Sequence, residues 1–313
     1  MKPHTWRKLI RPGFGVAVSV SDAVGGGVDQ HPLVLEQLRR ADSLLLFSDI
    51  GGDHRGATHR AHSFLVLDPA SLHRWLPLWG SLRHRLLPDG RRMSYERLGD
   101  RRRRVALDHF LTASTELVGF LVTVLVEKKL SLFSSEEPIP SEFAHWKPRA
   151  FERLLTAVNV ASILLGGLTR SGQDVVSFSD EDDLAANDQR LWEVCDVFSR
   201  VSSHYLDHGL GHFRFATSKS DDGSRQMEDL LAFPDLAAGW LSELLGSYSR
   251  AGAALSEAVI LPPPESLPAK SKHLLAWAAA SSSNLRHVAV TVDPNGPRSR
   301  FLVRRLAFSA AGR

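Results

Sequence analysis

The sequence is poor in cysteine and in long apolar runs, and each shortage excludes a class of protein. Cys195 is the only cysteine among 313 residues, so no intrachain disulfide and no thiolate metal cluster can form. Any bound metal would need oxygen or imidazole ligands. No apolar segment is expected to reach the roughly 18 to 20 residues that cross a bilayer, and the first residues do not resemble a signal peptide. We therefore expect a cytoplasmic protein with no membrane partner.

Several motifs of nucleotide and ester chemistry are also missing. The chain has no P-loop, no Gly-x-Ser-x-Gly elbow and no dinucleotide fingerprint. Nucleotide hydrolysis by those routes and serine hydrolase chemistry are therefore disfavoured. The composition, 43% hydrophobic and 23% charged, suits a folded chain with one large core or two smaller ones.

The stretch from Leu44 to Gly52 joins an apolar run of strand length to one carboxylate and a glycine pair. A charge is unfavourable in the middle of a buried strand, so Asp49 at its end would lie at the sheet edge, facing a cation or a substrate. The alternative is that Asp49 only opens a turn with Gly51 and Gly52.

Hydrophobic periodicity predicts an α/β domain with a mixed sheet flanked by helices. Strands are predicted at 44–49, 62–67, 93–98, 119–126, 174–180 and 212–218, and helices at 31–40, 101–117, 149–168, 187–201 and 226–245. The last of these helices should break at Pro234, and Gly25-Gly26-Gly27 should form a flexible break. We divide the chain into an N-terminal extension (1–41), a main domain (42–250), and a C-terminal extension with a helix and a hairpin (251–313).

Three acidic residues fall in a suggestive order along this pattern. Asp49 ends the first strand, Asp180 ends a later strand, and Asp235 begins a late helix. They can meet only if the two strands are neighbours in one sheet and the helix end packs over their tips. Each also has an ordinary alternative, since Asp180 could cap a helix or sit in an acidic turn and Asp235 follows Pro234 at a normal helix start.

The net charge is +3, and the positive residues cluster. Arginine makes bidentate contacts with phosphate, so a run at the start of a helix beside an acidic pocket could hold a nucleic-acid backbone. A solvated helix face is the alternative. The residues assigned to this role are Arg97, Arg101, Arg102, Arg103, Arg104 and Lys128.

The order of these features resembles the RNase H-like, or retroviral-integrase-like, superfamily. Within it, residues 42–247 are most similar to a bacterial family of unknown function whose first strand ends in Asp-Glu-Ser-Gly and whose late helix carries Ala-Asp-Leu-x-Ala-Gly. The corresponding segments here are Asp49–Gly52, Val176–Glu181 and Leu231–Gly239. The resemblance implies a nuclease that uses Mg²⁺ or Mn²⁺ and acts on DNA or RNA. It also implies a setting in mobile elements or antiphage defence, with partner proteins from a defence operon.

On this resemblance Asp49, Asp180 and Asp235 are the expected catalytic residues and metal ligands. The family's Glu after the first Asp is Ile50 here, which removes a carboxylate, so Glu181 and Asp229 are candidate replacements, as are Asp182 and Asp183. Two-metal phosphoryl transfer needs enough carboxylates to hold both cations. The rival hypothesis is therefore a catalytically silent module that binds nucleic acid or a partner protein.

Histidines give weaker signals. His204, His208 and His212 recur every fourth residue, but two glycines interrupt any helix that could align them for zinc. His54 and His59, in the predicted loop after Asp49, could shuttle protons or bind phosphate, although surface loop histidines are the more ordinary interpretation.

Overall fold

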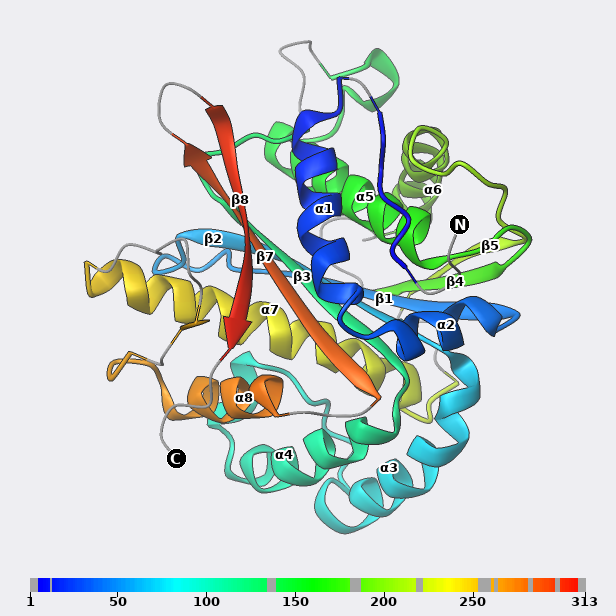
Figure 1. The fold of residues 1–313 in the computed structure, drawn as a ribbon. Coiled ribbons are helices and arrows are strands. Elements are labelled where there is room, and N and C mark those ends of the chain that lie inside the picture. Colours follow the sequence, from blue (N-terminus) through cyan, green and yellow to red (C-terminus); the bar gives the residue numbers. More distant parts are fainter. Residues whose placement is uncertain are drawn as a thin grey trace.

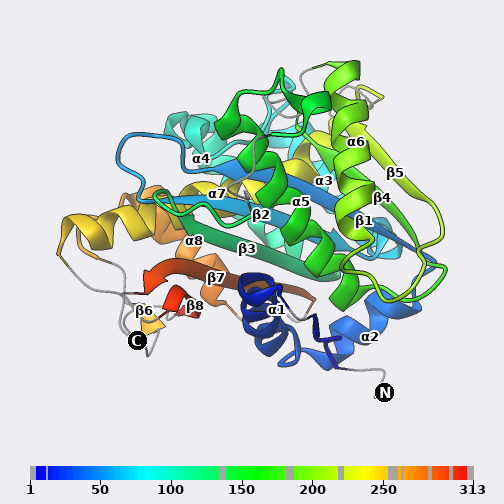
Figure 2. The same cartoon turned by 90° about the horizontal axis from the view of Figure 1, so that it is seen from above.

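The computed structural model describes residues 5–11, 13–133, 139–180, 187–217, 222–252, 260–261, 264–280, 284–295 and 299–308. Within these ranges the chain forms a mixed β-sheet between two layers of helices, an α/β architecture (Figures 1 and 2). The strands are β1 (Ser43–Gly51), β2 (His59–Leu67), β3 (Gly119–Glu127), β4 (Asp174–Ser179), β5 (Phe213–Thr217), β6 (Ile260–Leu261), β7 (Leu285–Asn295) and β8 (Ser299–Phe308).

The helices divide into two layers according to the sheet face they cover (Figure 1). The α5 layer consists of α1 (Gly15–Val28), α2 (Pro32–Arg40), α5 (Pro148–Leu168) and α6 (Asp188–Ser202). The α7 layer consists of α3 (Leu72–Leu86), α4 (Arg101–Ala113), α7 (Gln226–Arg250) and α8 (Ala269–Ala279).

The strand order is β5-β4-β1-β2-β3-β7-β8-β6. Strands β1, β2 and β3 are antiparallel neighbours, whereas β4 runs parallel to β1, and β5 runs parallel to β4. Strand β7 runs parallel to β3, so β1, β3, β4, β5 and β7 all end at the same edge of the sheet. The segment after residue 251 therefore widens the main sheet through β7 and β8.

Alternation along the strands builds two separate cores, because successive strand residues point to opposite faces. In β3, which is buried on both sides, Phe120 and Val122 join the core under the α5 layer, while Leu121 and Leu125 join the core under the α7 layer. In β1, Leu44 and Leu46 face the α5 layer and Phe47 faces the α7 layer. A side chain's layer can thus be read from its position in the strand.

Most predicted elements are confirmed, but the strand predicted at 93–98 is wrong. These residues form a loop and a short 3₁₀ turn (Glu96–Gly99), and helix α3 before them was not predicted. Met93, Tyr95 and Leu98 are buried in the α7-layer core, so their apolar spacing reflects contacts with helices. The first hairpin is therefore followed by two helices and then by β3.

Two predicted breaks do not occur. Helix α7 continues through Pro234 from Gln226 to Arg250, although proline removes one backbone donor from a helix. The glycines Gly25 to Gly27 lie inside α1, where a side chain at Gly25 would collide with the Trp6 ring and one at Gly27 with Val288. These glycines permit close packing.

Helix α5 corrects the expectation that no segment could span a membrane. Among the described residues it is the one helix long and apolar enough, with a mean hydropathy of 1.4. However, 78% of that window is buried inside the protein, between the sheet and helices α1 and α6. Its apolar surface therefore packs within the fold.

Two glycine substitutions test how closely the start of β3 packs against β2. A side chain at Gly119, where β3 begins beside β2, would collide with the Val66 carbonyl oxygen, so we expect Gly119→Ala to lower the free energy of unfolding by about 1 to 3 kcal/mol. In Gly80→Ala, the matched control in α3, the added methyl meets nothing within 4 Å and should stabilise by about 0.5 to 1 kcal/mol. Denaturant midpoints measure both, and equal shifts would contradict the packing at Gly119.

Candidate active site

Asp49 and Asp180 occupy aligned positions on neighbouring parallel strands. The register between β1 and β4 pairs Phe47 with Phe178 and Ser48 with Ser179, so the next residue on each strand is one of the two aspartates. Strand β1 itself continues to Gly51 against β2, so Asp49 lies two residues before the strand end, and it is the first residue beyond the pairing with β4. The predicted adjacency of the two strands is confirmed.

Both side chains point toward the α7 layer. Phe47 and Phe178, two residues earlier on each strand, stack on this face with ring centroids 5.0 Å apart. Two residues after Asp49, a Cβ at Gly51 would lie 2.9 Å from the Cβ of Ala238 on α7. Strand alternation then places Asp49 and Asp180 on the face that α7 covers.

Asp235 lies on α7, one turn before Ala238, in the middle of the helix, so the prediction that it begins a helix is wrong. Its Oδ2 accepts a hydrogen bond of 2.8 Å from the backbone N–H of Tyr95. One turn further on, a side chain at Gly239 would collide with the Tyr95 ring. The late sequence motif thus holds the loop before α4 against α7.

Arg92, in that same loop, is hydrogen-bonded to Asp180 and lies close enough to Asp235 for their charges to interact. Its Nη2 lies 2.5 Å from Asp180 Oδ2, and both side chains are about 30% exposed. Burial alone would lower the pKa of Arg92, but the hydrogen bond and charge of Asp180, with the charges of Glu228 and Asp235, raise it overall. Arg92 was not among the predicted site residues.

The loop that carries Arg92 is fixed to the start of α4. Asp100 caps α4 by accepting from the N–H groups of Arg102 and Arg103. The buried Arg103 side chain bonds Asp100 Oδ2 at 3.0 Å and donates through Nε to the Arg92 carbonyl at 2.8 Å. Arg103, in the arginine run, is therefore bonded to the backbone of Arg92, whose side chain is bonded to Asp180.

The other predicted phosphate-binding residues differ in the exposure and contacts of their side chains. The side chains of Arg97, Arg101 and Arg104 are exposed and make no hydrogen bond or ion pair within the described part of the chain. Arg102, 61% exposed, pairs with Asp89. Lys128 follows β3 at the edge where β1 and β4 end, and its Nζ donates to the His54 carbonyl at 3.0 Å. Arg103 is structural and Arg102 is paired, so three exposed arginines whose side chains have no described partner remain of the five.

Asp229, one of the candidate replacement ligands, does not join the site. Both carboxylate oxygens of Asp229 accept hydrogen bonds from Arg83, and Trp79 Nε1 donates to one of them at 2.6 Å. Asp229 is fully buried, and this burial raises its pKa while the bonds from Arg83 lower it. It ties α7 to α3. Glu181, Asp182 and Asp183 lie outside the described residues.

Ile50, which stands where the resembling family has Glu, affects the candidate site less than the sequence suggests. Ile50 is paired with His62 of β2, and strand alternation directs both toward the α5 layer, the side opposite to Asp49. A glutamate in this position would enter the other face of the sheet. Its absence therefore removes nothing from the face shared by Asp49 and Asp180.

The histidines are engaged elsewhere. His59 is buried, with its Nε2 2.8 Å from Asp293 Oδ1, so it is not a surface loop residue. His208 contacts Arg7, Asp207 and Thr169 after α6 has ended. In the part of the chain that the structure describes, no group of three His, Cys, Asp or Glu residues could hold a metal.

The fit to a divalent cation is therefore incomplete. Asp49 and Asp180 offer the oxygen ligands that Mg²⁺ and Mn²⁺ prefer, on one face and in register. However, Arg92 already supplies a positive charge at Asp180. In this arrangement the residues fit an internal ion pair and do not fit a bound metal.

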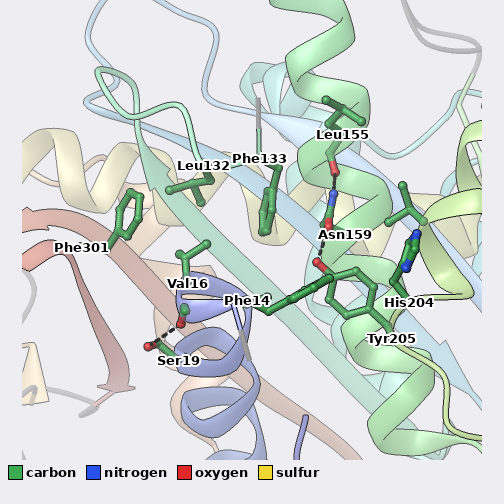
Figure 3. Close-up of a pocket in the computed structure, with 14 residues that line it drawn as sticks. Phe14, Val16, Ser19, Leu132, Phe133, Leu155, Asn159, His204, Tyr205 and Phe301 are labelled. Carbon is green, nitrogen blue, oxygen red and sulfur yellow. Dashed lines mark hydrogen bonds between the residues drawn. The ribbon is translucent and has the colours of Figure 1, made fainter. Parts of the chain in front are cut away.

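A cavity of about 740 Å³ lies in the α5 layer, away from the carboxylates (Figure 3). Phe14, Phe133 and Tyr205 line it, with Asn159 accepting a hydrogen bond from the Tyr205 hydroxyl. None of its 14 lining residues is Asp, Glu, Lys or Arg. It is separate from the candidate site.

In comparisons with known proteins, no family model matches the chain, and no curated protein is significantly similar to it in sequence. The geometry of the site therefore carries the functional argument.

The pH dependence of stability tests the position of Asp235. Burial raises the pKa of Asp235 to about 6, although the Tyr95 N–H and the charge of Arg92 act to lower it. Because the folded state holds the proton more tightly than the unfolded chain, the stability from this group is full below the ordinary pKa of 3.8 and is lost as pH rises through about 6. We expect Asp235→Asn, which keeps an acceptor for Tyr95, to remove roughly 2 to 3 kcal/mol of this pH dependence. The same pH dependence of the unfolding free energy in wild type and Asp235→Asn would contradict this prediction.

Proposed function

We propose that this protein acts on nucleic acid as a divalent-metal-dependent nuclease of the RNase H-like type, with Asp49, Asp180 and Asp235 as its acidic residues. The observation that carries the proposal is the alignment of Asp49 and Asp180 on adjacent parallel strands, on the face covered by the helix that bears Asp235. Metal-assisted phosphodiester hydrolysis uses carboxylate ligands, and Asp49 and Asp180 supply two of them at one sheet edge.

The strand order supports the RNase H-like part of the proposal. An antiparallel hairpin, β1 and β2, comes first and is extended by β3; the chain then alternates α5, β4, α6, β5 and α7. Strands β4 and β5 add in parallel on the free side of β1. This hairpin-first order, with carboxylates on the first strand, a later strand and a late helix, is the one that the sequence resemblance implies.

Basic residues near the acidic edge support nucleic acid as the substrate. Arg101 and Arg104 extend from the first turn of α4 into solvent, and the neighbouring Arg103 anchors that turn to the loop that reaches Asp180. Arginine side chains in this position can contact phosphates flanking the carboxylates.

One observation favours the rival, a catalytically silent module that binds nucleic acid or a partner protein. The ion pair between Arg92 and Asp180 satisfies a carboxylate that a metal would need. If this pair is permanent, the fold would retain the surface for binding but lack the chemistry.

Cleavage assays separate the two functions. We expect the wild-type protein to cut nucleic acid in Mg²⁺ or Mn²⁺, and Asp49→Asn to reduce the rate by at least about 100-fold, since a lost ligand charge weakens metal binding strongly. Gln substitution of the exposed Arg11, on the opposite helix layer, is the control and should keep full activity. Wild-type cleavage by Asp49→Asn, with metal still required, would show that another site does the chemistry.

Binding assays test the basic surface independently. We expect the double substitution Arg101→Gln and Arg104→Gln to weaken nucleic-acid binding on every sequence alike, and to reduce the slope of log affinity against log salt by up to about 2. The control removes the same charge far from the edge, through Arg11→Gln and Arg40→Gln. An unchanged slope would return Arg101 and Arg104 to a solvated helix face.

A further inference from the structure

We propose that Arg60, Arg153 and Lys128 form a second phosphate-binding site for the nucleic-acid backbone, on the α5 side of the sheet edge where β1 and β3 end. The site acts through its charge and its N–H donors and needs no metal. The inference deepens the proposed function and rests on it for the choice of nucleic acid as the ligand.

Three cationic side chains from different elements meet around one carboxylate, that of Asp53 in the loop after β1. Arg60 Nε on β2 lies 3.4 Å from Asp53 Oδ1, and Arg153 Nη1 on α5 lies 2.8 Å from Asp53 Oδ2. Lys128 follows β3, and the charges of Asp53 and Arg60 both act on its ammonium group. These four side chains therefore carry three positive charges and one negative charge.

The direction of the side chains places this cluster on the α5 side of the sheet. Arg60 is four residues before Phe64 on β2, so both point to the same face, and Phe64 packs in the core under the α5 layer. Arg153 extends from the second turn of α5 itself. The exposed arginines of α4 belong to the α7 layer, so basic residues flank the same edge on both faces.

Two of the cations keep N–H groups that their described contacts do not use. Among the described residues, the Arg60 side chain is hydrogen-bonded through Nε alone, and Lys128 Nζ donates once, to the His54 carbonyl. A guanidinium has five N–H donors and an ammonium has three. Since the Arg60 side chain is 19% exposed and the Asp53 side chain 53% exposed, a phosphate can reach the cluster from solvent.

Neighbouring titratable groups respond to this positive charge. Burial, and then the charges of Arg60 and Arg153, lower the pKa of His62 to about 3, so this histidine is neutral at neutral pH. Burial also lowers the pKa of Lys128, and the charge of Arg60 acts in the same direction while Asp53 opposes it. A bound phosphate would reduce the repulsion between Arg60 and Lys128.

Asp53 has two opposing effects on such a site. Its carboxylate accepts from Arg60 and Arg153 and so positions both side chains. Its negative charge, however, repels a phosphate that approaches them. A purely structural ion-pair cluster and a phosphate site therefore differ in what the loss of this one charge does to nucleic-acid binding.

The test is the equilibrium binding of a fluorescent single-stranded oligonucleotide, and of its duplex, measured by anisotropy in EDTA so that neither metal nor cleavage contributes. We expect Arg60→Gln and Lys128→Gln each to weaken binding about three- to tenfold and to reduce the slope of log affinity against log salt by about 1. The control is Arg40→Gln, which removes an equal charge from an exposed arginine paired with Glu36 on α2 and should bind as wild type does.

Asp53→Asn should change binding in the opposite direction. We expect it to bind about threefold more tightly than wild type, because the repelling charge is lost while the amide oxygen still accepts a hydrogen bond. Its control, Glu36→Gln, removes the acid of the α2 pair and should leave binding unchanged. If Arg60→Gln does not fold, Lys128→Gln and Asp53→Asn decide the result.

Three results would overturn the inference. They are no binding of either oligonucleotide by wild type, wild-type affinity and salt slope in a folded Arg60→Gln or Lys128→Gln, and weaker or unchanged binding in a folded Asp53→Asn.

The nuclease proposal fails separately. If Arg60→Gln and Lys128→Gln lose affinity and yet wild type does not cleave nucleic acid in Mg²⁺ or Mn²⁺, the phosphate site is real and the nuclease assignment is wrong. If wild type cleaves and both variants bind as it does, only this site is wrong.

Discussion

Strands β1 and β4 are hydrogen-bonded in parallel, with Phe47 opposite Phe178, and the arrangement of the site depends on this register. A shift by one residue would turn Asp49 or Asp180 to the opposite face, because side chains alternate along a strand. The stacked rings of Phe47 and Phe178 resist such a shift, since they are held in the core under α7. Apolar packing two residues away thus places two charged groups together.

Helix α7 positions the loop whose Arg92 side chain lies against Asp180. Through Asp235 and Gly239 it holds Tyr95, whose hydroxyl reaches Ser271 of α8 at 2.7 Å and whose ring lies under Lys270. Tyr95 fixes the loop from which Arg92 extends. The motif Leu231–Gly239, which the sequence predicts to be catalytic, therefore also holds the loop before α4 against α7. Asp235 takes part in both the proposed catalysis and this packing.

The sequence predicted what depends on local pattern and missed what depends on distant contacts. Apolar runs and helical periodicity located the first two strands and β3, β4 and β5, and the order of the aspartates was enough to predict that β1 and β4 are neighbours. The 93–98 stretch, which the sequence predicts to be a strand, is a loop whose Met93, Tyr95 and Leu98 are buried in the α7-layer core. The partner of Asp229, Arg83, is 146 residues away, and the partner of Asp180, Arg92, is 88 residues away. No periodicity encodes such pairs.

The two functional hypotheses differ chiefly in which cation Asp180 holds. A carboxylate that is partly removed from water needs positive charge close by, and either a guanidinium or a metal ion can supply it. The Asp229 carboxylate is fully buried and accepts three hydrogen bonds from Arg83 and Trp79. Loss of Arg83 from this pair would leave a buried charge unpaired. The pair between Arg92 and Asp180 differs, because both side chains are about 30% exposed and remain in contact with water. Of these two carboxylate–arginine pairs, the one at Asp180 is the one that remains in contact with water, and it lies beside Asp49.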